Sequence, residues 1–234
     1  MGAGLPLPAA SGLGAARSSG ARTLDPTQFS PNPRDLVDRF GDAKLGTMKL
    51  SPMLADEFLE SFGGRLEFIS YGGECREALV VMGREAGGGR SAVQVESGES
   101  ESASDEHLPV QDEPSDYLYE ADPAAIRAHC LASIAARHDL AGLADSNGYL
   151  TGNALIHSPW LTTYRVLGSN KGDMKETRKA LEYLGASTPV WKQRGAELNL
   201  EKVSKQIQLK GKRPLFVIAY RIGKSFRFVI AERA

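Results

Sequence analysis

Clustered basic side chains near the C-terminal end are the residues of this sequence best suited to binding chemistry. Lys192 and Arg194 are two positions apart in a segment typical of a strand, so both should point to one face while Trp191 points to the other. More cations follow on an expected helix and in the loop after it: Lys202, Lys205, Lys210, Lys212 and Arg213. Such a surface can contact phosphate groups, and the alternative is an ordinary solvated face.

The charge is divided along the chain. Residues 165–234 contain 16 Lys and Arg against six Asp and Glu, a net charge of +10, although the 234-residue chain carries −1 as a whole. Residues 96–122 contain ten carboxylates and no Lys or Arg. Repulsion and low hydrophobicity predict an acidic disordered linker over residues 85–116. The alternative is a segment that covers the basic C-terminal face.

No catalytic or metal-binding residue is predicted. The four histidines lack ligand spacing, and Gly223-Lys224-Ser225 favours a hairpin turn because Ile218 stands where a phosphate loop needs glycine. No residue can be identified as a base for the Cys75 thiol, although Arg76 beside it could lower the thiol pKa. Two distant cysteines and the lack of a signal peptide or an 18-residue apolar run predict a cytoplasmic protein with no membrane partner.

The expected elements indicate an α+β fold in several segments. Residues 163–234 predict the order β-α-β-α-β-β, with Asp173 to Glu176 as a capping box and a closing hairpin at Gly223. Upstream, strands are expected at 46–52, 65–71 and 77–82, the last two joined by a turn at Gly72-Gly73, and one helix from Asp122 to about His138. The predicted organisation is a disordered tail (1–20), a first domain (21–84), the acidic linker (85–116), a helix with an irregular connection (117–162) and a compact module (163–234).

Several short motifs resemble one bacterial family. Residues 117–127 (YLYEADPAAIR), 190–195 (VWKQRG) and 209–214 (LKGKRP) resemble the THUMP-like C-terminal region of class I S-adenosylmethionine-dependent methyltransferase-related proteins. Residues 22–26, 49–52 and 73–78 resemble the late part of the methyltransferase domain of that family. The resemblance implies the incomplete C-terminal strands of a Rossmann-type domain followed by a THUMP-like domain. It also implies RNA, either tRNA or rRNA, as a partner and S-adenosylmethionine as the cofactor of intact relatives.

The sequence departs from this family at the cofactor loop. Gly12-Leu13-Gly14 is the early glycine pair, but no apolar strand precedes it, so no cofactor binding is expected in this chain. The first half of the Rossmann-type sheet would then be missing, because the gene is truncated or split or because another polypeptide completes the domain. Three functions follow: an RNA-binding module, one subunit of a split RNA methyltransferase, or a truncated product with no independent role.

Overall fold

The computed structural model describes residues 25, 28–41, 43–144 and 147–234, so the tail expected over residues 1–20 lies outside the described residues. The chain divides into two compact units. Unit 1 contains Met1–Ser104 and Asp122–Cys130, and unit 2 contains Asp105–Ala121 and Leu131–Ala234. The division differs from the expected one, because each unit takes two separate stretches of the sequence.

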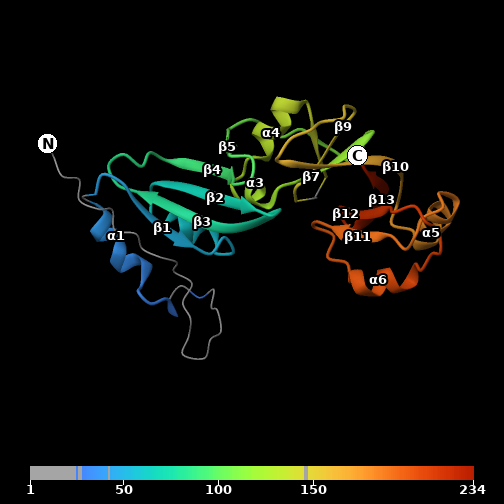
Figure 1. Cartoon of the computed structure of the whole chain (residues 1–234), viewed down its shortest axis with the longest axis horizontal. Helices are drawn as coiled ribbons and strands as arrows, with labels where there is room; N and C mark the ends of the chain where they lie inside the picture. Colours follow the sequence, from blue (N-terminus) through green and yellow to red (C-terminus); the bar gives the residue numbers. More distant parts are fainter. Residues whose placement is uncertain (1–24, 26–27, 42, 145–146) are drawn as a thin grey trace. The chain divides into compact units, whose positions relative to one another are not determined.

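Unit 1 is built on a five-stranded sheet with the strand order β1-β3-β2-β4-β5 (Figure 1). Its strands are β1 (Gly46–Leu50), β2 (Arg65–Tyr71), β3 (Glu74–Met82), β4 (Gly89–Gln94) and β5 (Ser100–Ser102). The β2–β3 hairpin turns at Gly72 and Gly73, which have φ of 64° and 72°, as the glycine pair predicts. Among the described strand pairs of this sheet, only β2 and β4 are parallel.

The prediction of a disordered acidic linker over residues 85–116 is wrong where β4 and β5 form. Strand β4 pairs with β2 through the backbone, which needs no apolar side chain in the added strand. Ala92 is fully buried, and the side chain of Glu101 in β5 is buried as well. A third strand, β6 (Val110–Gln111), lies later in the same stretch and belongs to unit 2. Composition alone therefore underestimated the order of this segment.

The described residues of unit 1 form the helices α1 (Pro33–Gly41), α2 (Asp56–Glu60) and α3 (Pro123–Arg127). The Asp122 side chain accepts from the backbone N–H of Ala124 at 2.7 Å, so the predicted start of α3 is confirmed. The predicted continuous helix is wrong, because His129 has φ of 61° and separates α3 from α4 (Leu131–His138). This left-handed residue cannot belong to an α-helix. Helix α3 packs on β2, β3 and β4 over the buried Phe68.

Unit 2 contains an eight-stranded sheet with the order β11-β12-β13-β10-β7-β9-β8-β6. Its further strands are β7 (Tyr117–Ala121), β8 (Ala141–Leu143), β9 (Tyr149–Gly152), β10 (Leu161–Asn170), β11 (Val190–Gln193), β12 (Phe216–Ile222) and β13 (Ser225–Arg233). Strands β8 and β9 form within the irregular connection expected in residues 117–162. Strand β10 pairs with β13 on one side and β7 on the other, so residues 163–234 share a sheet with earlier strands instead of forming a separate module.

The predicted β-α-β-α-β-β order of the last seventy residues is confirmed. Helix α5 (Met174–Tyr183) follows β10, and helix α6 (Leu200–Gln206) lies between β11 and β12. Asp173 caps α5 by accepting from the backbone N–H groups of Lys175 and Glu176, at 2.7 and 3.0 Å. The β12–β13 hairpin turns between Ile222 and Ser225, as predicted.

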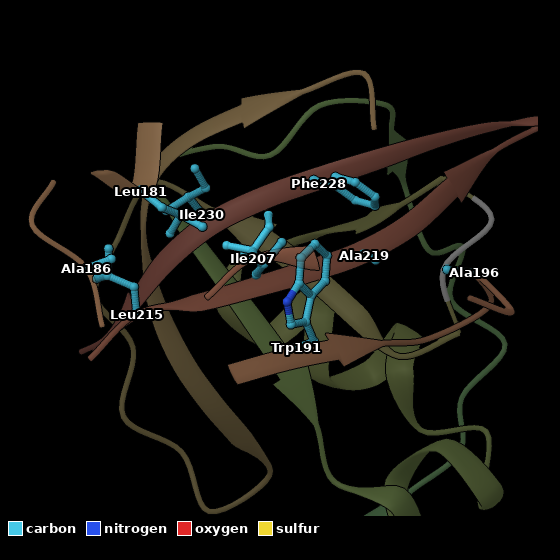
Figure 2. Packing of buried hydrophobic residues seen from close by; sticks show 10 residues of the cluster. Leu181, Ala186, Trp191, Ala196, Ile207, Leu215, Ala219, Phe228 and Ile230 are labelled. Atoms are coloured by element: carbon cyan, nitrogen blue, oxygen red, sulfur yellow. The ribbon is translucent and has the colours of Figure 1, made fainter. Parts of the chain in front are cut away.

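Two apolar clusters cover the two faces of this sheet. The Trp191 and Phe228 rings meet edge to face at 5.3 Å (Figure 2). Residues of α5 and α6 pack in the same cluster. Phe216 and Tyr220 belong to the cluster on the opposite face. Phe216 and Tyr220 of β12 therefore do not share a row with Phe226 and Phe228 of β13. Phe228 pairs with Ala219, so even positions of one strand lie beside odd positions of the other.

Candidate functional site

The basic loop, residues 209–214, is fixed by its backbone. The N–H groups of Lys212 and Arg213 both donate to the carbonyl oxygen of Gly185, each at 3.1 Å. A β-carbon on Gly211 would lie 2.2 Å from that same oxygen, so this close approach requires glycine. The loop is therefore held against the residues that follow α5.

Three lysines of the predicted site are exposed on the basic loop and on α6. Lys210 and Lys212 lie in the loop and Lys202 lies in α6. Within the part of the chain that the structure describes, none of these three forms an ion pair. Lys205 is exposed too, but its ammonium group lies 2.6 Å from the carboxylate of Glu201. Lys202, Lys210 and Lys212 thus present their charge to solvent.

Arg213 differs from its two lysine neighbours in the basic loop. Its Nη2 atom lies 2.6 Å from Oε2 of Glu232 in β13, and its side chain is partly buried. The backbone carbonyl of Arg213 also accepts from the N–H of Ser187 at 2.9 Å. Arg213 therefore anchors the loop to the sheet while Lys210 and Lys212 remain exposed.

Lys192 in β11 and Arg194 directly after this strand point to the same side, as predicted, and both contact Glu120 of β7. Lys192 Nζ is 2.6 Å from Glu120 Oε2, and Arg194 Nη2 is 3.5 Å from Glu120 Oε1. The hydroxyl of Tyr164 donates to the same carboxylate at 3.1 Å. Burial lowers the pKa of Lys192, but the hydrogen bond and charge of Glu120 outweigh it and raise that pKa. These two cations are engaged inside unit 2.

Part of the acidic stretch contacts the basic strands of unit 2. Glu113 Oε1 lies 2.9 Å from Nε of Arg227 in β13. The hydroxyl of Tyr220 in β12 donates to the backbone carbonyl of Asp112 at 2.6 Å. The segment that follows β6 therefore contacts β12 and β13 and pairs with one cation there, Arg227. The covered charges are those of the strands, whereas the exposed lysines of the basic loop and α6 remain in solvent.

A charged cluster in unit 1 was not found by sequence reasoning. Asp56 Oδ1 lies 3.0 Å from Arg90 Nη2 and 2.8 Å from Arg127 Nη2, and its Oδ2 lies 3.1 Å from His129 Nε2. The guanidinium groups of Arg90 and Arg127 lie over the Phe68 ring, 5.3 and 5.1 Å from its centroid. The cluster spans 73 positions of the sequence, from Asp56 to His129, so no local pattern could have indicated it.

Burial opposes ionisation of Asp56, but the hydrogen bond and charge of Arg90 outweigh it, and the pKa of this carboxyl is lowered. Asp56 thus holds two arginines as a structural anion.

The Cys75 thiol also differs from what the sequence suggested for its pKa. Burial is the main cause that raises the pKa of its thiol to about 11, so Arg76 does not activate it.

The glycines of the described residues do not fit a methyl-donor loop. Such a loop has a G-x-G pattern between a buried strand and a helix. Gly172 and Gly195 precede α5 and α6, but each is a single glycine, and the side chains of Asp173 and Asn199 cap the two helices. None of the described strand-to-helix connections contains the G-x-G pattern.

The described helices include none long and apolar enough to cross a membrane.

Comparison with known proteins gives two kinds of likeness. No family model matches the chain. Over 221 residues it is 30% identical to a protein of Mycobacterium tuberculosis, in strains CDC 1551 / Oshkosh and ATCC 25618 / H37Rv, called an uncharacterized S-adenosylmethionine-dependent methyltransferase. The alignment covers 89% of this chain and 59% of the relative, so the chain spans about three fifths of the length of these curated relatives.

A solved structure shares the fold. The crystal structure of a candidate methyltransferase from Porphyromonas gingivalis W83 superimposes with a TM-score of 0.69 over 89% of this chain and 56% of the other, at 14% identity. The relatives by sequence and by structure thus carry methyltransferase names. This chain has a mixed α and β fold that is also present in a protein of that description.

Proposed function

We propose that this chain is the RNA-binding part of a protein of the S-adenosylmethionine-dependent methyltransferase type, with residues 163–234 forming the basic part of a THUMP-like unit whose sheet also contains earlier strands. The observation that carries the proposal is the basic loop. It is fixed by backbone hydrogen bonds at Gly185, and it exposes Lys210 and Lys212. A rigid loop loses little conformational freedom on binding, so its charges are well placed for phosphate contacts.

The exposed lysines should supply most of the phosphate contacts. Lys192, Arg194 and Arg213 already have acidic partners at 2.6 to 3.5 Å, so their contribution to RNA affinity should be smaller than the sequence predicts. Lys202, Lys210 and Lys212 have no such partner in the described chain. Phosphate contacts of this kind read no bases, so binding should be nearly independent of sequence.

The test replaces Lys210 and Lys212 by Gln and measures the affinity for a short structured RNA at several salt concentrations. We expect weaker binding, and a logarithmic salt slope reduced by about 0.7 to 0.9 for each lost phosphate contact. The matched control replaces Lys44 and Lys49 of unit 1, which form ion pairs with Glu85 and Glu77. Equal losses in both double variants would show a general charge effect and contradict a site on the basic loop.

A second candidate is a subunit of a split RNA methyltransferase, favoured by the names of the relatives and by the share of their length that this chain spans. This candidate needs another polypeptide to supply the methyl-donor loop. Titration calorimetry of the chain with S-adenosylmethionine tests it. If S-adenosylmethionine binds only when the partner polypeptide is present, the result supports the split enzyme. If S-adenosylmethionine binds to the chain alone at micromolar affinity, the result contradicts our proposal that this chain binds RNA without a cofactor.

A further inference from the structure

Tyr183 is an aromatic residue in an unusual position at the end of α5. Its side chain is 91% exposed. The opposite side of the helix is fixed in the core, where Thr177 and Leu181 are fully buried. Burying the Tyr183 ring in this fold would therefore require the helix to turn over, so the ring stays in solvent in the described structure.

Two lysines continue the row that Tyr183 ends. Lys175, Lys179 and Tyr183 follow each other at intervals of four residues, which places them on one face of α5, one per turn. Both lysines are exposed. This face is turned away from the buried Thr177 and Leu181, so the two charges and the ring share the solvent side of the helix.

The same row ends at the basic loop. Gly185, two residues after Tyr183, accepts the backbone hydrogen bonds of Lys212 and Arg213 that fix this loop. The backbone of Tyr183 is therefore two residues from the glycine that holds the basic loop, whose lysines Lys210 and Lys212 are exposed. An exposed aromatic ring among cations offers two contacts to a nucleic acid: phosphates bind the charges, and a base stacks on the ring.

We propose that Tyr183 stacks on an unpaired base of RNA whose phosphates follow Lys175 and Lys179 toward the basic loop. This inference rests on the proposed RNA binding and specifies the kind of RNA. A base inside a duplex is stacked on its neighbours and cannot offer its face to Tyr183. The site should therefore favour a single-stranded segment over a duplex, without a strong preference for one base.

The test compares two labelled RNA probes, a 12-nucleotide oligouridylate and a blunt duplex of the same length, by fluorescence anisotropy with the full chain. In Tyr183→Ala we expect the affinity for oligouridylate to fall by roughly 5- to 100-fold, the range for the loss of one stacked base. Affinity for the duplex and the salt slope should change little, because no charge is removed. Tyr183→Phe keeps the ring and should bind oligouridylate nearly as well as the unaltered chain.

Tyr71 is the matched control, because it is an exposed tyrosine at 56% exposure in unit 1. Tyr71→Ala should leave both affinities unchanged. If the chain binds RNA but Tyr183→Ala binds oligouridylate as tightly as before, the stacking role is overturned and the proposed RNA binding stands. If the unaltered chain binds neither probe, the proposed function and the stacking role are both overturned.

Discussion

Units 1 and 2 each gather two cations around one carboxylate, but they use different cations. In unit 1, Asp56 holds Arg90 and Arg127, and both guanidinium groups lie over the ring of Phe68. In unit 2, Glu120 holds Lys192 together with Arg194. The ring near the ammonium group of Lys192 is that of Tyr164, at 5.9 Å.

The difference shows that the pH range over which such a cluster persists depends on whether its cations are arginine or lysine. Arginine keeps its charge over the whole pH range and stacks on aromatic rings, whereas lysine can lose its proton in alkali. The unit 1 cluster should therefore fail only in acid, when Asp56 is protonated. The unit 2 cluster has an additional alkaline limit. Both clusters occupy their cations, which distinguishes them from the exposed lysines of the basic loop.

The largest effect is expected for Asp56→Ala, which leaves two partly buried guanidinium groups without their shared anion. The side chain of Arg90 is only 11% exposed. We expect unit 1 to lose about 3 kcal/mol of unfolding free energy, the lower end for breaking a buried ion pair. Hydrogen exchange of peptides from β2 and β4 measures it. Glu60→Ala is the control, because Glu60 contacts Arg90 from an exposed position and should cost below about 1 kcal/mol.

A smaller loss is expected for Glu120→Ala in unit 2. Lys192 and Arg194 are 31% and 23% exposed, so water partly replaces the missing carboxylate and the cost should be about 2 kcal/mol. Both tryptophans of the chain, Trp160 and Trp191, belong to unit 2, so their fluorescence in urea reports this loss. Glu197→Ala is the control, since Glu197 is exposed and lies 3.8 Å from Arg221. An equal loss of unfolding free energy in both variants would show that the cluster around Glu120 stabilises unit 2 no more than an exposed ion pair does.

The smallest expected effect is the pH dependence of the two clusters. The pKa of Asp56 is lowered from 3.8, so its contribution is present above that value and is lost as pH falls through the folded-state pKa. The pKa of Lys192 is raised from 10.5, so its contribution is present below that value and is lost as pH rises through the folded-state pKa. Urea unfolding at a series of pH values should show the acid loss disappear in Asp56→Asn and the alkaline loss disappear in Lys192→Met. Unchanged pH profiles in these variants would contradict the comparison.

Local sequence signals predicted local structure well. The glycine pair at Gly72 and Gly73 indicated the β2–β3 hairpin, and Asp122 and Asp173 indicated two helix starts that the structure confirms. These signals depend on neighbouring residues only. Alternation also placed Lys192 and Arg194 on one side of the chain and Trp191 on the other.

Long-range pairing explains most of the errors. The segment expected as a linker became β4 and β5 because β2 supplied a backbone edge to pair with. Residues 163–234 were expected to form a module of their own, yet β10 pairs with β7. A strand edge is available to any suitable partner, and composition does not tell which segment will occupy it.

By itself, the sequence determined the turns, the helix starts, the alternation of strand faces and the net charge of +10 in the last seventy residues, because each depends on residue types close together in the chain. Only the tertiary structure decided which of those charges remain in solvent. Glu120 and Glu232 lie far from Lys192 and Arg213 in the sequence and reach them only when β7 and β13 are in place. Ion pairing acts over a few ångströms of space, and the distance along the chain does not set it.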